Sequence, residues 1–176
     1  MRLRDYIYSD RMDYHPFFSK DHLFEYLLRP EGYWIKRYLL SLRAEEYYTL
    51  CKPNKLLKYF YRRRKNILGS RLGFFITSGC LGKGVKIYHY GSIMINPKAR
   101  IGTNCTMHGN CCIGSKGSFP DDSPVIGNYV DIGQNAQLLG GITIADGVKI
   151  GAGAVVTKSV LTPGITIAGV PARVIK

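Results

Sequence analysis

Aliphatic residues return at every sixth position between residues 95 and 161, and a small or apolar residue follows four places after most of them. The segment divides into ten hexads, INPKAR, IGTNCT, MHGNCC and IGSKGS before a break and IGNYVD, IGQNAQ, LLGGIT, IADGVK, IGAGAV and VTKSVL after it. The leading positions are Ile95, Ile101, Met107, Ile113, Ile126, Ile132, Leu138, Ile144, Ile150 and Val156. The fifth positions include Ala99, Cys105, Cys111, Val130, Ala136, Ile142, Val148 and Ala154.

A strict period of six matches neither the 3.6-residue period of a helix nor the two-residue alternation of a half-buried strand. It is typical of short parallel strands that stack as a prism, with one large inward residue and one small residue on each flat face, and with Gly, Asn or Asp at the corners. Three hexads complete one coil, and the stacked coils bury a continuous aliphatic ladder. The alternative is a Gly-rich sandwich, but sandwich turns recur at about 8–12 residues.

The repeat is interrupted at two places. The same spacing extends upstream through Phe75, Leu81, Ile87 and Ile93, and a two-residue slip then separates Ile93 from Ile95, just after His89. The second interruption is the segment GSKGSFPDDSP between Ile113 and Ile126, which predicts a loop. In a solenoid, such interruptions project from a regular wall and are common places for function.

The sequence before the repeat predicts a small helical region. Residues 1–15 are polar and tyrosine-rich, and we expect them to be irregular. Helices are predicted over residues 19–29, with Ser19 as the N-cap, over 31–50, and over 54–68, where the cluster Arg62–Lys65 suits a helix C-terminus. We therefore predict a helical cap over 1–70, joined by the connector GSRLGFF to a β-helix domain over 71–176.

The charge distribution and the cysteines indicate which ligands and which cellular compartment are expected. The net charge is +13, and residues 51–120 contain thirteen Lys or Arg with no Asp or Glu, so this stretch should face any anionic ligand. Contact of the basic cluster with a membrane surface or a lipid-linked phosphate is one alternative, and a solvated helix end or a subunit contact is another. The five cysteines form no C-x-x-C pair and are predicted to be reduced and buried. The first ten residues contain no apolar run that would suit a signal peptide. Together with the cysteine pattern, this predicts a cytoplasmic protein that binds no metal. We expect no nucleic-acid partner.

Two histidines lie at irregular positions of the repeat. His89 follows Ile87 and Tyr88 at the phase break, and His108 occupies the second place of its hexad, where neighbouring hexads have glycine. The second place is a strand end or turn, so the His108 side chain should project outward. An imidazole can act as a general base near neutral pH, and both residues are candidate catalytic groups.

The stretch LGFFITSGCLGKGVKIYHYGSIMINPKARIGTNCTMHGNCCIG, with the closing GAGAVVTKSVLTPGITIAGVPARVI, resembles the serine O-acetyltransferase-like branch of the hexapeptide-repeat acyltransferases. That branch includes acetyltransferases of capsule and lipopolysaccharide synthesis. The resemblance implies a left-handed parallel β-helix, acetyl-CoA as co-substrate, His89 as the general base, and a homotrimer with active sites between subunits.

The resemblance also implies ligand-binding positions. Candidates for acetyl-CoA are the small residues and two cations Gly133, Ala136, Gly151, Ala152, Ala154, Lys158 and Arg173. Candidates for the acceptor are Tyr88, Tyr90, Asp121 and Asp122.

The sequence departs from the serine acetyltransferase pattern around the predicted base. Tyr88 stands where those enzymes have a serine-binding aspartate, and no carboxylate occurs from Tyr47 to Pro120. A carboxylate partner for His89 must therefore come from Asp121, Asp122, Asp131, Asp146 or the helical cap. These departures favour O-acetylation of a sugar, with serine O-acetylation as the alternative and a non-catalytic scaffold as a third interpretation.

Overall fold

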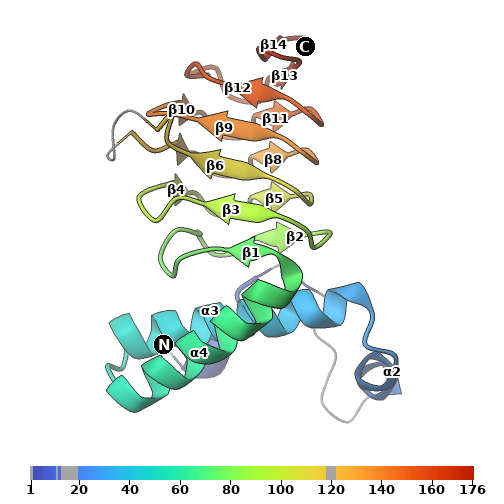
Figure 1. Ribbon diagram of the computed structural model, residues 1–176, viewed down its shortest axis with the longest axis vertical. Helices are drawn as coiled ribbons and strands as arrows, with labels where there is room; N and C mark the ends of the chain where they lie inside the picture. The colour runs from blue at the N-terminus through green and yellow to red at the C-terminus, as the bar shows by residue number, and fades with distance from the viewer. Residues whose placement is uncertain (1, 11, 13–19, 118–121) are drawn as a thin grey trace.

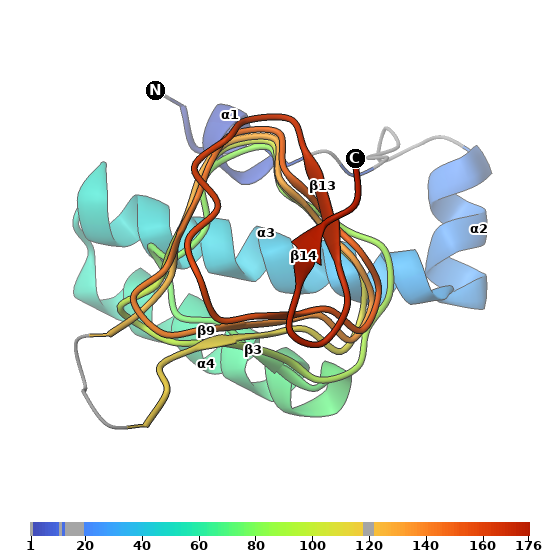
Figure 2. The ribbon, with the colours of Figure 1, turned by 90° about the horizontal axis from the view of Figure 1, so that it is seen from above.

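The computed structural model describes residues 2–10, 12, 20–117 and 122–176, and its β-strands form a left-handed parallel β-helix above a group of helices (Figure 1). Seen from above, the coils form a triangular outline (Figure 2). The predicted fold class is confirmed. The expected N-cap Ser19 lies outside the described residues.

Within the described residues, fourteen strands form three walls, and neighbouring strands are parallel except for β13 and β14. The first wall has the order β1-β3-β6-β9-β12, the second β10-β7-β4, and the third β14-β13-β11-β8-β5-β2. Their bounds are β1 Phe74–Phe75, β2 Lys86–Ile87, β3 Ile93–Ile95, β4 Arg100–Ile101, β5 Thr106–Met107, β6 Cys112–Gly114, β7 Val125–Ile126, β8 Asp131–Ile132, β9 Gln137–Leu139, β10 Thr143–Ile144, β11 Lys149–Ile150, β12 Val155–Val156, β13 Thr166–Ala168 and β14 Arg173–Val174.

The inward aliphatic residues stack in register on each wall. On the third wall Ile87, Met107, Ile132, Ile150 and Ile167 are successive partners. All of these side chains are at most 3% exposed, as are most of the predicted fifth-position residues. The corners use the residues that the repeat predicted, since Asn104, Asn110 and Asn135 all adopt positive φ. The ladder therefore gives each coil a hydrophobic surface that only the next coil can cover.

One detail of the predicted phase was wrong. Phe74 rather than Phe75 points inward, because α4 ends in a left-handed residue at Gly73 and β1 then pairs Phe74 with Ile93; Phe75 is 61% exposed. The two-residue slip lies within β3, where Ile93 and Ile95 are both buried and Met94 between them points outward.

Four helices occupy the described part of the N-terminal region: α1 Leu3–Ile7, α2 Lys20–Leu28, α3 Glu31–Leu50 and α4 Lys55–Leu72. Three were predicted, but α1 lies in the stretch expected to be irregular. The α4 helix begins at Asn54, whose side chain accepts a hydrogen bond from the Leu57 amide, and it continues four residues past the expected end at 68. The segment expected to be a connector is thus largely helical. The α4 helix crosses the predicted domain boundary at residue 70, and the division into two domains stays a prediction.

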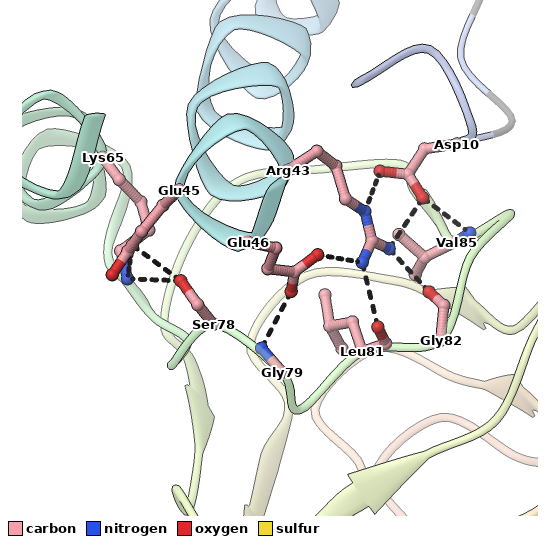
Figure 3. A network of polar contacts seen from close by, with 10 residues as sticks. All are labelled: Asp10, Arg43, Glu45, Glu46, Lys65, Ser78, Gly79, Leu81, Gly82 and Val85. Carbon is pink, nitrogen blue, oxygen red and sulfur yellow. Dashed lines mark hydrogen bonds and ion pairs between the residues drawn. The ribbon is translucent and has the colours of Figure 1, made fainter. Parts of the chain in front are cut away.

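A buried arginine attaches α3 to the first coil (Figure 3). The Arg43 guanidinium, 1% exposed, binds both carboxylate oxygens of Asp10 at 2.8 and 2.9 Å and one of Glu46 at 2.9 Å. It also donates to the carbonyl oxygens of Leu81 and Gly82. Burial alone would lower the pKa of Arg43, but hydrogen bonds and charge attraction from Asp10 and Glu46 outweigh it and raise this pKa.

A second polar cluster joins α3, α4 and the coil. The buried Glu45 carboxylate contacts Arg62 at 2.7 Å, Lys65 at 2.9 Å and the Ser78 hydroxyl at 2.6 Å. Burial by itself would raise the pKa of Glu45, but these hydrogen bonds lower it below its usual range. The predicted role of the basic cluster at a helix C-terminus is therefore wrong, because all four of its members lie inside α4 and two of them pair with α3.

In the part of the chain that the structure describes, none of the helices is both long and apolar enough to cross a bilayer.

Replacing Arg43 with alanine should lower the free energy of unfolding by about 3–5 kcal/mol, because Asp10 and Glu46 would remain buried without their partner. Urea denaturation followed by circular dichroism at one fixed protein concentration measures this. Arg2→Ala, which removes an exposed ion pair with Asp5, is the matched control and should leave the transition midpoint in place. Equal midpoints for the two variants would contradict the role of the Arg43 network.

Candidate functional site

His89 lies at the prism corner between β2 and β3, and its side chain is 58% exposed. Its Nδ1 atom is 3.2 Å from Oε2 of Glu31, which stands in the first turn of α3. The other carboxylate oxygen of Glu31 accepts a hydrogen bond from the Tyr90 amide at 2.7 Å. The carboxylate partner of His89 thus comes from the helical cap, one of the sources that the sequence left open.

The Glu31 contact determines which ring nitrogen of His89 is available for chemistry. An ionised carboxylate only accepts hydrogen bonds, so Nδ1 carries the proton and Nε2 keeps its lone pair. An exposed Nε2 beside a carboxylate-held Nδ1 is the arrangement that a general base requires.

His108 lies one coil further along, at the corner after β5. Its Nε2 is 3.2 Å from Oδ1 of Asp131, and its side chain is 32% exposed. The Tyr88 ring stacks on the His108 ring with centroids 4.8 Å apart, and the Lys86 ammonium lies 4.5 Å from the Tyr88 centroid. Each imidazole contacts one carboxylate, but that of His108 is also stacked on Tyr88 and is less exposed than that of His89.

The register places Tyr88, not His89, directly above His108. Ile87 pairs with Met107, so the residues that follow them, Tyr88 and His108, are neighbours. His89 is beside Gly109, where an added Cβ would lie 2.9 Å from the Tyr90 carbonyl oxygen and 3.4 Å from the His89 Cβ. A glycine at 109 is therefore needed for the His89 corner to close.

A cavity of about 230 Å³ adjoins this corner. It is lined by Trp34 of α3, by Leu68, Arg71 and Leu72 of α4, and by Tyr90. Trp34 stands three residues after Glu31, on the same side of α3, so one helix presents both the carboxylate and the indole to the corner. Aromatic rings with one guanidinium suit a ring-shaped or anionic group.

The predicted acetyl-CoA positions fall into two groups. Gly133 and Gly151 continue the corner column above His108, and Ala152 is exposed beside them. Ala136 and Ala154 are fully buried inside the prism, and their amides already donate to Gly133 and Gly151. Of these positions Ala152 is open to a ligand, whereas the next coil fills the space beside Gly133 and Gly151, and the two buried alanines are covered.

Lys158 and Arg173 line one cavity of about 280 Å³ at the C-terminal end of the prism. Four coil steps separate the His89 corner from β13, which at the usual strand spacing is about 19 Å. The two predicted cations are thus brought together, away from the histidines.

Asp122 lies at a different corner of the same chain from His89. It follows β6 and precedes β7, and its carboxylate lies close to Gly140 and Gly141. The His89 corner instead joins β2 to β3. Asp121 lies outside the described residues. Within one chain the structure does not bring Asp122 to His89.

Comparison with known proteins shows which proteins the repeat is similar to. Residues 123–158 match the family model described as bacterial transferase hexapeptide (six repeats). The chain is 28% identical over 153 residues to a serine acetyltransferase of Buchnera aphidicola, and 35% identical over 113 residues to one of Helicobacter pylori. A solved serine acetyltransferase of Brucella abortus, in complex with coenzyme A, is 25% identical with a TM-score of 0.63 and covers 98% of this chain.

Over its repeat, the chain is similar to hexapeptide-repeat transferases. It spans 58% of the Buchnera protein, 66% of the Helicobacter protein and 66% of the Brucella chain. These hexapeptide-repeat relatives are serine acetyltransferases, and none of the three is an enzyme of capsule or lipopolysaccharide synthesis.

Two parts of this hexapeptide-repeat site were missed from sequence. Glu31 opens a helix 58 residues before His89, and Arg71 was placed in a connector. Neither has a spacing that predicts contact with the repeat. A helix with its first turn at Glu31 was predicted, but its direction across the coil was not.

The thiol of Cys111 is buried in the repeat and is poorly suited to act as a nucleophile. Cys111 is 1% exposed, and burial raises its pKa to about 11, so its thiolate is scarce. Cys51 at the end of α3 is exposed, contrary to the prediction that all five cysteines are buried, and Cys112 is partly exposed. In the described residues, no group of three or more His, Cys, Asp or Glu side chains could hold a metal ion.

Alkylation of the native protein by iodoacetamide at about pH 8 should modify Cys51 rapidly and leave Cys111 unmodified, because only Cys51 is exposed and an ordinary thiol has a pKa of about 8.5. Peptide mass spectrometry measures both sites. In denaturant the two rates should converge. Rapid labelling of Cys111 in the folded protein would show that the thiol is open to substrates.

Proposed function

We propose that the chain is an acetyl-CoA-dependent O-acetyltransferase with His89 as its general base. One observation carries the proposal: Glu31 holds Nδ1 of an exposed histidine at a corner of the β-helix, which leaves Nε2 free to take a proton. The similarity to serine acetyltransferases, one of them solved with coenzyme A, supports the same chemistry.

The proposed step is direct acetyl transfer. Nε2 of His89 removes the proton of an acceptor hydroxyl while its oxygen attacks the thioester carbon. The tetrahedral intermediate then expels the coenzyme A sulfur, which takes up the proton from His89, and an acetyl ester and free coenzyme A remain. Glu31 stabilises the imidazolium formed between these events.

Acetyl-CoA is proposed to lie along the corner column that leads from His89 toward the C-terminal end. Gly133 and Gly151 let successive coils stack closely there, and the exposed Ala152 beside them leaves room for a ligand. Lys158 and Arg173 share a cavity at that end and would bind the phosphates.

Serine is the acceptor that the comparisons support, and it replaces the sugar favoured by the sequence. The relatives named above are serine acetyltransferases. Serine has the primary hydroxyl that the proposed base requires.

A sugar hydroxyl remains the second candidate because of the cavity beside His89. Trp34 and Tyr90 offer aromatic surfaces and Arg71 a guanidinium, which suit an acidic sugar ring. The carboxylates nearest the corner, Glu31 and Asp131, already contact imidazoles, and Tyr88 offers no charge to a serine ammonium group.

The proposed assembly is the homotrimer implied by the resemblance, with acceptor sites between subunits. In such an assembly Asp121 and Asp122 would come from a neighbouring chain. The cytoplasmic location stays a prediction.

The wild-type protein should release free thiol from acetyl-CoA in the presence of L-serine, and His89→Ala should lower kcat by on the order of 10²–10⁴-fold, the usual loss for a general base. A coupled thiol-release assay measures both. Acetyl-CoA binding, measured by calorimetry, should change little in the variant.

The control for this assay is His108→Ala, which should cost less and mainly raise the acceptor KM. A larger loss for His108→Ala would reverse the two assignments. Turnover of glucuronic or galacturonic acid in place of serine would select the second candidate, and the absence of turnover with serine and every sugar would favour the scaffold.

Glu31→Gln should lower kcat on the order of 10–100-fold, because a charge-assisted hydrogen bond contributes about 1.5–3 kcal/mol and the imidazolium loses it. The KM for acetyl-CoA should be unchanged, since Gln still accepts the Tyr90 amide and keeps the corner in place. Glu25→Gln makes the same change at a carboxylate that pairs with Lys36 on the neighbouring helix. Equal kcat values for the two variants would remove Glu31 from the mechanism.

A further inference from the structure

The α4 helix exposes an apolar stripe that no described part of the chain covers. Leu56, Tyr59, Phe60 and Ile67 are 84%, 60%, 57% and 40% exposed. Leu56, Phe60 and Ile67 follow helical spacing on the side opposite to Lys65, Leu68 and Leu72, which are buried against the rest of the fold. We call Lys55, Leu56, Tyr59, Phe60, Arg63 and Ile67 the outer face of α4.

The same face is strongly basic. Lys55 and Arg63 are exposed within it, and Lys52 is exposed just before the helix. The α4 sequence contains no Asp or Glu, and the nearest acid on α3, Glu45, is buried and already paired with Arg62 and Lys65. The charge of the outer face is therefore not neutralised by a neighbouring side chain shown in the structure.

The position of α4 leaves this face accessible. The helix lies at the end of the prism opposite to β14 (Figure 1) and runs along the side that carries β3 and β9 (Figure 2). Its eighteen residues span about 27 Å, so the stripe can lie flat on a surface.

We propose that the outer face of α4 binds the surface of an anionic lipid bilayer. An interfacial helix combines Lys and Arg with Phe, Tyr and Leu on one side and buries its apolar residues among the headgroups, and the outer face has this composition. The choice of a bilayer rests on charge complementarity, since the cations attract anionic headgroups while the leucine and aromatic side chains enter the interface. The contact is peripheral, and it is independent of the acetyl acceptor.

The affinity should depend on both the charges and the apolar residues. Each Lys or Arg near an anionic surface strengthens binding by about fivefold. The electrostatic part should weaken as the Debye length falls from about 30 Å at 0.01 M salt to about 8 Å at 0.15 M.

The test is co-sedimentation of the full chain with vesicles of phosphatidylglycerol and phosphatidylcholine, compared with vesicles of phosphatidylcholine alone. Binding is expected only to the anionic vesicles and should weaken as salt rises. Lys55→Glu/Arg63→Glu should weaken it by about 25-fold or more, from two lost contributions of about fivefold each. Leu56→Ser/Phe60→Ser should weaken it by about tenfold or more.

Lys20→Glu/Lys149→Glu is the matched control, because it makes the same change in net charge at exposed positions outside α4. It should retain most of the vesicle binding. Thiol release in solution should stay at the wild-type level in both outer-face variants, so a failure of this proposal is distinct from a failure of the acetyltransferase assignment.

Three results would overturn the proposal. They are equal binding to neutral vesicles, equal losses in the control and outer-face variants, and no binding to either kind of vesicle. Light scattering identifies the competing occupant: a drop in oligomeric mass on Leu56→Ser/Phe60→Ser, without vesicle binding by the wild type, would mean that a second copy of the chain covers the face.

Discussion

The attachment of α3 to the first coil by Arg43 is the interaction on which the candidate site depends. The guanidinium is buried with Asp10 and Glu46 and also binds two carbonyl oxygens of the coil. A buried charge of this kind is tolerated only when its partners are in place, so it favours one position of the helix over others. That position brings Glu31, twelve residues earlier on the same helix, to the corner that carries His89.

In the β-helix, the residues that stabilise the fold and the residues that could carry out chemistry occupy different positions. Its inward positions are filled by aliphatic ladders that every coil needs, and they tolerate little change because a buried gap or clash is costly. Its corners need glycine or asparagine at particular positions, but they also leave side chains exposed, and there the chain places His89 and His108. The basic excess lies mainly outside this arrangement, on α4, where part of it pairs with Glu45 and part faces outward.

The candidate site was predictable where it follows the repeat. His89 was identified because it lies at the phase break, and His108 because it stands where neighbouring hexads have glycine; both lie at exposed or half-exposed corners. Lys158 and Arg173, named from the resemblance, line one cavity. The alanines at 136 and 154 were named for their small size, but small residues are also what the interior of a narrow prism requires, and both are buried. The acceptor favoured from charge was the sugar, whereas the relatives are serine acetyltransferases.

The hexad period alone determined the coils, their inward residues and most of their corners. Each wall repeats the same local geometry, and only one register of the parallel strands buries every aliphatic residue. It also determined where the regular wall is interrupted. Only the tertiary structure decided that Phe74 points inward, that α4 continues to Leu72, and that Glu31 rather than an aspartate of the repeat holds His89. These features depend on how a helix crosses the end of the prism, and that crossing is set by contacts between residues more than thirty positions apart, such as Arg43 with Asp10 and with Leu81. Local periodicity contains no information about such pairs.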